Sequence, residues 1–243
     1  MPTVRLDLSY DGTDFRGYAK QPDVRTVQAE IERALETLFG LVETTVAGRT
    51  DAGVHARHQV VSFAVDTPVE VGAAHRSLNR LLPDDIVVTA VATAPDGFSA
   101  RFSATKRIYR YAILNQLLPD PFLRRVSWHV KDDLDAFVMN QAARHMLGEH
   151  DFASFCRRAR GRSTVRTVTS AKWTEPHAAE LRFEIEGVAF CHQMVRSIVA
   201  LCVDVGRGLV DLDDVGGILD ARDRNAGRGA APPHGLTLWH IEY

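Results

Sequence analysis

The sequence has few cysteines, no long apolar run and almost no lysine. Three cysteines without any CxxC spacing argue against a disulfide framework and against a zinc site built from cysteines. No apolar stretch approaches the length that a membrane span needs, and the strand-like TVRLDLSY after the first residues lacks the basic and apolar order of a secretion signal. We therefore expect a cytoplasmic protein with reduced cysteines and no membrane association.

The sequence also lacks the usual signals of a cofactor. No GxGxxG or GxxxxGK pattern occurs, so we expect no nucleotide cofactor. His55 and His58 form an HxxH pair, but no third ligand follows at a familiar spacing, and we therefore expect no metal. Cys191 precedes His192, yet sequence neighbours seldom adopt the geometry of a catalytic thiol and base.

Basic residues are unevenly distributed along the chain. The formal net charge of -2 would by itself argue against a nucleic-acid partner. Residues 97–119 and 152–174, however, contain no acidic residue, and arginines far outnumber lysines. A GC-rich genome could explain the arginine total but not the two acid-free windows. Because arginine suits forked contacts to phosphate, the windows predict RNA-binding surfaces. Their candidate contacts are Arg101, Lys106, Arg107, Arg110, Arg158, Arg160 and Arg162.

Hydrophobic periodicity predicts strands that alternate with helices. Apolar and polar side chains alternate in the half-buried strands expected around residues 4–8, 61–65 and 181–186. Helical spacing predicts four helices, at 27–38 after an N-cap at Thr26, at about 71–82, at about 134–147 after Asp132 or Asp133, and from near Phe190 towards Gly206. We therefore expect an α+β fold.

The order of these elements predicts two domains. A strand–helix–strand–helix–strand series runs to about residue 100, and a similar series follows. We expect two docked α/β halves, residues 1–104 and 105–243, with antiparallel or mixed sheets. Helices should pack on one face of the sheets, leaving the opposite face as a basic RNA-binding cleft.

The segment AGRTDAGVHARHQVVSF, residues 47–63, is the most informative part of the chain. Gly48 and Gly53 bracket Arg49, Thr50 and Asp51 just before an expected strand, which predicts a tight loop that presents a carboxylate. A neighbouring guanidinium favours the ionised form of that carboxylate, which is then a usable nucleophile. Taken alone, such a triplet is more often a solvated turn.

A longer set of motifs decides between these interpretations. GRTDAGVHA resembles the catalytic motif of the tRNA pseudouridine synthase A (TruA) family. Six further segments resemble the same family in the same order and cover nearly the whole chain, namely SYDGTDF, TVQ, RFSATKRIYRY, GEHDFASFC, HQMVRSIV and APPHGLTLWHIEY.

The resemblance implies a role for four residues. The nucleophilic aspartate of the family falls on Asp51, its base-flipping arginine on Arg49, its substrate-contacting tyrosine on Tyr109, and a second arginine that pairs with the aspartate on Arg196. Tyr111 is the competing tyrosine, since residues two apart in a strand face the same side. The first half would thus carry the aspartate loop, and the second half the tyrosine and the arginine helix.

The chain departs from the family pattern in one segment. The family has a tryptophan and a glutamine after its first motif, whereas this chain reads RGYAKQP at residues 16–22. We expect Tyr18 to replace the packing of the tryptophan, and Gln21 is retained. We expect this departure to change the RNA contacts of that loop rather than catalysis.

The resemblance also implies an activity and partners. The enzyme would isomerise uridine to pseudouridine on the 3′ side of the tRNA anticodon stem and loop (positions 38–40 in tRNA numbering), as a homodimer and without a cofactor. Two alternatives remain, a non-catalytic RNA chaperone of the same fold and a metal-dependent RNA hydrolase that uses His55 and His58. Isomerisation leaves the mass of the RNA unchanged, binding alone leaves uridine as uridine, and hydrolysis shortens the RNA.

Overall fold

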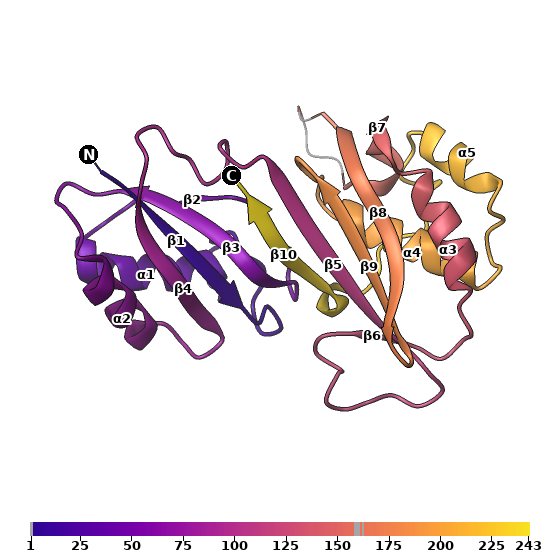
Figure 1. Ribbon diagram of the computed structural model, residues 1–243, viewed down its shortest axis with the longest axis horizontal. Helices are drawn as coiled ribbons and strands as arrows, with labels where there is room; N and C mark the ends of the chain where they lie inside the picture. Colours follow the sequence, from indigo (N-terminus) through magenta and orange to yellow (C-terminus); the bar gives the residue numbers. More distant parts are fainter. Residues whose placement is uncertain (1, 158–160, 162) are drawn as a thin grey trace. The chain divides into compact units, whose positions relative to one another are not determined.

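The computed structural model describes residues 2–157, 161 and 163–243, and its chain divides into two compact units (Figure 1). The first unit comprises residues 1–105 and 237–243, and the second comprises residues 106–236. We expected residues 237–243 in the second half. They lie in the first unit because the last strand pairs in parallel with a strand of that unit, with Thr237 opposite His55. A pairing between segments so distant in the sequence has no local signal.

The first unit is built on a sheet in the order β4-β1-β3-β10, with β2 paired to β3. β1 is antiparallel to both of its neighbours, whereas β10 is parallel to β3. The strands are β1 (Thr3–Tyr10), β2 (Thr45–Val46), β3 (His55–Ala64), β4 (Ile86–Ala94) and β10 (Leu236–Glu242).

Two helices, α1 (Val27–Phe39) and α2 (Val71–Leu81), cover one face of this sheet (Figure 1). Alternate side chains of β1 point to that face and are buried, as the sequence pattern predicts. The Phe39 ring of α1 lies 5.7 Å from the Phe63 ring of β3. This contact shows which face of β3 the helix covers.

The second unit is built on strands in the order β5-β9-β8-β7, with β6 paired in parallel to β5. Its strands are β5 (Lys106–Asn115), β6 (Trp128–Val130), β7 (Gly148–Asp151), β8 (Val165–His177) and β9 (Glu180–Gly187). Its helices are α3 (Ala136–Arg144), α4 (Met194–Gly206) and α5 (Asp214–Asp220), with 3₁₀ turns η1 (Phe152–Phe155) and η2 (Pro233–Gly235).

The register of β5, β9 and β8 separates the two faces of the second sheet. Tyr111, Phe183 and Trp173 align across the three strands and are buried. The charge of Arg196 on α4 acts on the hydroxyl of Tyr111, so α4 lies on this face. The next row on the opposite face is charged, consisting of Arg110, Glu184 and Lys172.

Thr26 caps α1 as predicted, and its hydroxyl oxygen accepts the N–H of Ala29. The predicted start of the third helix was wrong. α3 begins after Asp135 rather than after Asp132 or Asp133, because the carboxylate of Asp135 accepts the N–H groups of Phe137 and Val138.

The predicted start of the fourth helix was also wrong. It begins at Met194 and not near Phe190, because Gln193 has the left-handed φ of 66° and interrupts any helix before it. α5 was not predicted. Among the described residues, no helix combines the length and the apolar character that crossing a bilayer would require.

Candidate active site

The loop between β2 and β3 presents Asp51. This side chain is half-buried, while Thr50 is buried and Arg49 is exposed. The N–H of Tyr18 donates to the carbonyl of Thr50 at 3.1 Å, and the N–H of Val54 donates to the carbonyl of Asp51 at 3.1 Å. The backbone is therefore held on both sides of the candidate nucleophile.

Two buried side chains of the first unit hold this loop against the sheet. The amide of Gln59 donates to the carbonyl of Gly48 at 2.6 Å, and its oxygen accepts the N–H of Gly48 at 3.4 Å. The hydroxyl of Tyr10 lies 2.8 Å from that of Thr50. Burial raises the pKa of Tyr10 to about 12, so this hydroxyl stays protonated at neutral pH. Gln59 and Tyr10 thus form a clamp on the loop.

Tyr18 packs under the same loop. Its side chain is fully buried, and its ring lies 6.4 Å from the ring of Tyr10. Gly17 has a φ of 96°, and a Cβ at this position would lie only 3.1 Å from the carbonyl oxygen of Thr50. The close approach of the two loops requires glycine here. The packing role that the sequence suggested for Tyr18 agrees with this environment.

The two candidate tyrosines of β5 differ in their surroundings. Tyr109 is 8% exposed and meets the edge of Phe190, with 5.2 Å between ring centroids. Tyr111 is fully buried, and its hydroxyl donates to the carbonyl of Pro232 at 2.8 Å. Burial raises the pKa of Tyr111 far above its usual value. Tyr111 is therefore a structural residue, and its hydroxyl is committed to the backbone.

Arg196 lies in the first turn of α4, close to the same face of β5. Its Nε donates to the carbonyl of Ala231 at 2.7 Å, and the N–H of Ala231 donates to the carbonyl of Arg196 at 3.0 Å. Burial raises the pKa of Tyr111, and the positive charge of Arg196 partly opposes that shift, which places the guanidinium near this ring. Tyr109, Tyr111 and Arg196 thus gather on the helix-covered side of the second sheet.

The candidate RNA contacts occupy three kinds of environment. Arg101 is exposed and its guanidinium lies 5.1 Å from the ring centroid of Phe102. Arg107 is buried and donates to the carbonyl of Val188. Lys106 and Arg110 lie on the charged face of the second sheet and form ion pairs described below. The remaining candidates, Arg158, Arg160 and Arg162, lie outside the described residues.

Two ion pairs on the charged face join β5 to glutamates of β9. Arg110 lies 2.7 Å from Glu184, and Lys106 lies 3.3 Å from Glu186. Burial alone would raise the pKa of Glu184, but the hydrogen bond and charge of Arg110, together with Lys172, lower it. We expected a basic cleft on the face opposite the helices. In the second unit that face carries paired charges, whereas the candidate tyrosines lie on the helix-covered face, because successive residues of a strand point to opposite sides.

The comparison with known proteins decides the family. A model of the tRNA pseudouridine synthase family matches residues 8–103 and 142–243. The chain belongs to this family. The tRNA pseudouridine synthase A of Bacillus subtilis (strain 168) is 43% identical over 246 residues, which cover 99% of this chain and 98% of the relative. That of Streptomyces griseus is 46% identical over 254 residues, covering 99% of this chain and 87% of the relative.

The synthase is therefore an isomerase that converts uridine to pseudouridine in tRNA. Among solved structures, the archaeal box H/ACA sRNP Nop10–Cbf5 complex is similar with a TM-score of 0.33 and 14% identity, covering 95% of this chain and 55% of that chain. This similarity is too low to carry an argument.

The two histidines of the HxxH pair hold the fold of the synthase together. His55 Nδ1 accepts the N–H of Gly12 at 3.0 Å. His58 Nε2 lies 3.0 Å from Asp7, and its Nδ1 accepts the N–H of Ile241 at 3.2 Å. Within the described part of the chain, no three potential metal ligands come together.

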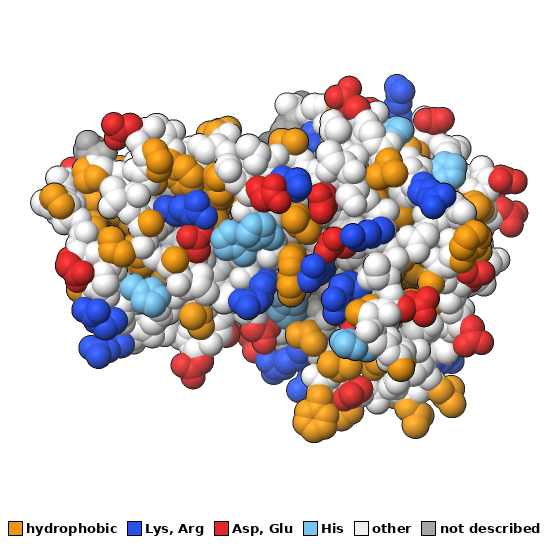
Figure 2. Space-filling model, viewed as in Figure 1, with side chains coloured by type: hydrophobic (Ala, Val, Ile, Leu, Met, Phe, Trp, Pro, Cys, Tyr) orange, Lys and Arg blue, Asp and Glu red, His pale blue; other side chains and the backbone are white. Residues whose placement is uncertain are grey.

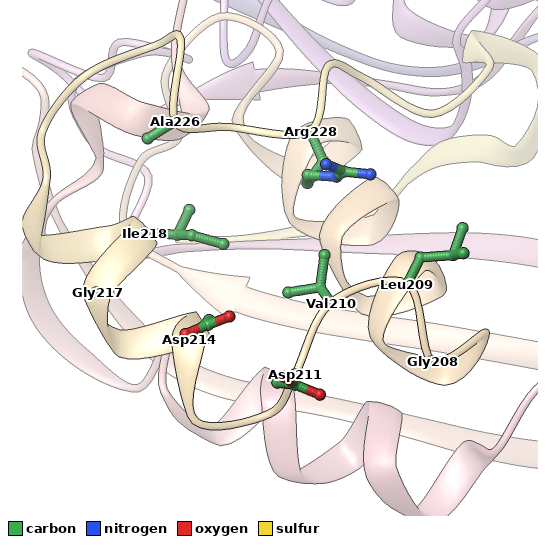
Figure 3. Close-up of a pocket in the computed structure, with 9 residues that line it drawn as sticks. All are labelled: Gly208, Leu209, Val210, Asp211, Asp214, Gly217, Ile218, Ala226 and Arg228. Carbon is green, nitrogen blue, oxygen red and sulfur yellow. The ribbon is translucent and has the colours of Figure 1, made fainter.

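A cavity of about 540 Å³ lies in the second unit, and none of the described candidate residues is among those that line it. Leu209 and Val210, which follow α4, and Ile218 of α5 contribute apolar side chains, while Asp211 and Asp214 contribute carboxylates (Figure 3). Sequence reasoning did not point to this cavity. Gln59 and Tyr10 were also missed, since a buried amide inside a strand gives no signal until its partner loop is known.

Removal of the clamp should disorder the aspartate loop measurably. Gln59→Leu keeps the side-chain volume but leaves both backbone groups of Gly48 without their partner. We expect the variant to lose about 1–3 kcal/mol of stability, and we expect faster hydrogen exchange in residues 47–54. Gln21→Leu is the matched control, because Gln21 is exposed and donates to the carbonyl of Arg16 in its own turn. Unchanged exchange in the Gln59 variant would contradict the clamp.

Proposed function

We propose that this synthase isomerises uridines 38–40 on the 3′ side of the tRNA anticodon stem and loop, with Asp51 as the nucleophile. One observation carries the proposal. Asp51 sits half-buried in a loop that buried side chains of the first unit fix in place, next to the exposed Arg49. A nucleophile needs such a fixed position, since misplacement by about 1 Å can cost 100-fold in rate.

The proposed reaction balances without an added reagent. Asp51 attacks the nucleoside, the bond between C1′ and N1 breaks, the uracil turns, C1′ joins C5, and the bond to Asp51 breaks to restore the carboxylate. The proton on C5 leaves, and N1 gains a proton, so the product has the mass of the substrate. Carboxylates serve as nucleophiles in other reactions of glycosidic bonds.

The target uridine must leave its stack before the reaction. Flipping a base costs about a few kcal/mol. Arg49, which is exposed, is proposed to fill the space that the base leaves, and the ring of Tyr109 to stack on the base. Arg196 is proposed to pair with Asp51. Loops and the ends of stems are the least costly targets, which fits the anticodon stem and loop.

We predict that Asp51→Asn abolishes pseudouridine formation and leaves tRNA binding within about threefold, because phosphate contacts supply most of the affinity. Pseudouridine mapping of treated tRNA, at positions 38–40 and elsewhere, measures the activity. Asp66→Asn is the matched control. Asp66 is exposed and follows β3, whereas Asp51 precedes it, and the ten-residue strand separates them by about 30 Å.

Pseudouridine formed by an Asp51→Asn preparation free of deamidated protein would contradict the nucleophile. Pseudouridine formed by the wild-type protein only outside the anticodon stem and loop would contradict the site on tRNA and leave the role of Asp51 standing. The chaperone alternative predicts binding without pseudouridine in every variant.

We predict opposite effects of removing the two tyrosine hydroxyls. Tyr109→Phe should lower turnover at least about 100-fold with binding kept, because a ring without a hydroxyl cannot take part in proton transfer. Tyr111→Phe should keep turnover and lose about 1 kcal/mol of stability, because its hydroxyl bonds to the carbonyl of Pro232. Single-turnover kinetics and thermal unfolding measure the two effects. If the two variants exchanged their behaviour, Tyr109 would not be the substrate tyrosine.

Of the seven basic candidates, Arg101, Arg158, Arg160 and Arg162 are proposed to contribute most of the contacts to tRNA phosphates. Arg107 is buried, and Lys106 and Arg110 pair with glutamates, so these three are proposed to contribute less. Replacing Arg158, Arg160 and Arg162 by alanine should reduce the slope of log affinity against log salt by up to about 2.7, since each phosphate contact contributes about 0.9. The triple alanine variant of Arg76, Arg80 and Arg144 removes the same charge from exposed helical positions. An equal change of slope in both triple variants would show that only net charge matters.

The synthase is also proposed to act as a homodimer in the cytoplasm. Hydrophobic side chains gather over the loop between β5 and β6 (Figure 2), where Leu117, Leu118 and Phe122 are 77%, 70% and 91% exposed. Exposed apolar clusters often mark protein interfaces. We expect sedimentation to give the mass of two chains, and Phe122→Asp to give one. Leu41→Asp, at another exposed leucine, should stay dimeric. A wild-type monomer with full activity would contradict the dimer.

A further inference from the structure

Two cysteines that are distant in the sequence meet in the second unit. Cys156 follows η1, and Cys191 precedes α4. Each thiol acts on the pKa of the other, so the two side chains are neighbours. One residue further along each segment, the N–H of Arg157 donates to the carbonyl of His192 at 3.0 Å. The backbone bond holds the two segments side by side, so the closeness of the two thiols is part of the fold.

The two thiols have unequal environments. Cys156 is 1% exposed, whereas Cys191 is half-buried, so reagents reach Cys191 first. The Sγ of Cys191 also lies 3.8 Å from the carbonyl oxygen of Thr164. The neighbouring thiol of Cys156 and the charge of Arg166, opposed by burial and by Asp151, lower the pKa of Cys191 to about 7. The neighbouring thiol of Cys191 and burial raise the pKa of Cys156.

The third cysteine provides a contrast within the same chain. Cys202 is buried inside α4, and burial raises its pKa to about 12. The thiolate is the reactive form of cysteine, so a buried thiol with a high pKa is inert. The chain therefore contains one accessible thiol with a neighbouring thiol and one isolated, unreactive thiol.

We propose that Cys191 and Cys156 form a peroxide-reactive pair that closes to a disulfide. The thiolate of Cys191 attacks one oxygen of hydrogen peroxide, the O–O bond breaks, and the released hydroxide takes up a proton to become water. Cys191 is then a sulfenic acid. The sulfur of Cys156 attacks the sulfur of Cys191, the S–O bond breaks, and a second water leaves with the thiol proton. Two thiols lose two electrons in total, and the peroxide gains them.

The bond would tie two functional segments together. Cys156 stands immediately before the arginine-rich segment that begins at Arg157, and Cys191 stands five residues before Arg196 of α4. The disulfide would close a long stretch of chain that contains β8 and β9, which constrains the unfolded state and raises the temperature of unfolding. The chemistry of the pair does not depend on the function proposed above for Asp51 or Tyr109.

The test treats the reduced full-length protein with hydrogen peroxide, blocks the remaining thiols under denaturing conditions, and maps the peptides by mass spectrometry. We expect a peptide in which Cys156 and Cys191 are joined, with only Cys202 alkylated. Dithiothreitol should restore three alkylated cysteines. In the untreated native protein at neutral pH, Cys191 should alkylate at least about tenfold faster than Cys202.

Three variants separate the steps. Cys191→Ser should prevent the disulfide and slow the reaction with peroxide at least tenfold. Cys156→Ser should stop the reaction at a sulfenic acid on Cys191, which dimedone traps. Cys202→Ala should behave as the wild type. The proposal is overturned if the wild-type peptide map shows a different pair, if Cys191 reacts no faster than Cys202, or if Cys191 passes to the sulfinic acid while Cys156 remains free. The wild-type map and alkylation rates decide the matter even if a variant fails to fold.

Discussion

The side-chain alternation of the β-strands is the constraint on which the candidate site depends. In β1 and β3 one row of side chains packs under α1, and that row includes Tyr10 and Gln59, which hold the aspartate loop. In β5 the equivalent row includes Tyr109 and Tyr111. A slip of one residue in either register would turn these groups to the opposite face. The apolar packing of each sheet therefore also sets the direction of the catalytic candidates.

The buried polar groups of the first unit position the aspartate loop more than they stabilise the fold. A buried amide stabilises a protein only modestly when it is fully bonded, and it costs more when its partners are missing. Gln59 meets this condition by bonding to both backbone groups of Gly48. The loop thereby gains a single position against the sheet. A leucine at this site would also be buried, but it could not bond to Gly48 and fix the loop.

The charges of the second unit illustrate why a basic sequence window is not the same as a basic surface. Lys106, Arg107 and Arg110 are neighbours in the sequence, yet Arg107 turns inward to a backbone carbonyl and the other two meet glutamates of β9. The alternation of β5 turns these side chains to opposite faces, and the glutamates of β9 neutralise two of the three charges. The acids that balance the window lie 74 residues after Arg110 and 80 residues after Lys106, so the composition of one segment could not reveal them.

The sequence by itself determined the family, the α+β class, the first two helices with the Thr26 cap, and the aspartate loop before β3, because each of these leaves a local motif or period. Only the tertiary structure decided which tyrosine hydroxyl is committed to the backbone, which cations are paired, and that β10 belongs to the first unit. The start of α3 also depended on which of three nearby aspartates could reach the free N–H groups. Local motifs consist of consecutive residues, whereas strand pairing, ion pairing and burial depend on segments that meet only after the chain has folded.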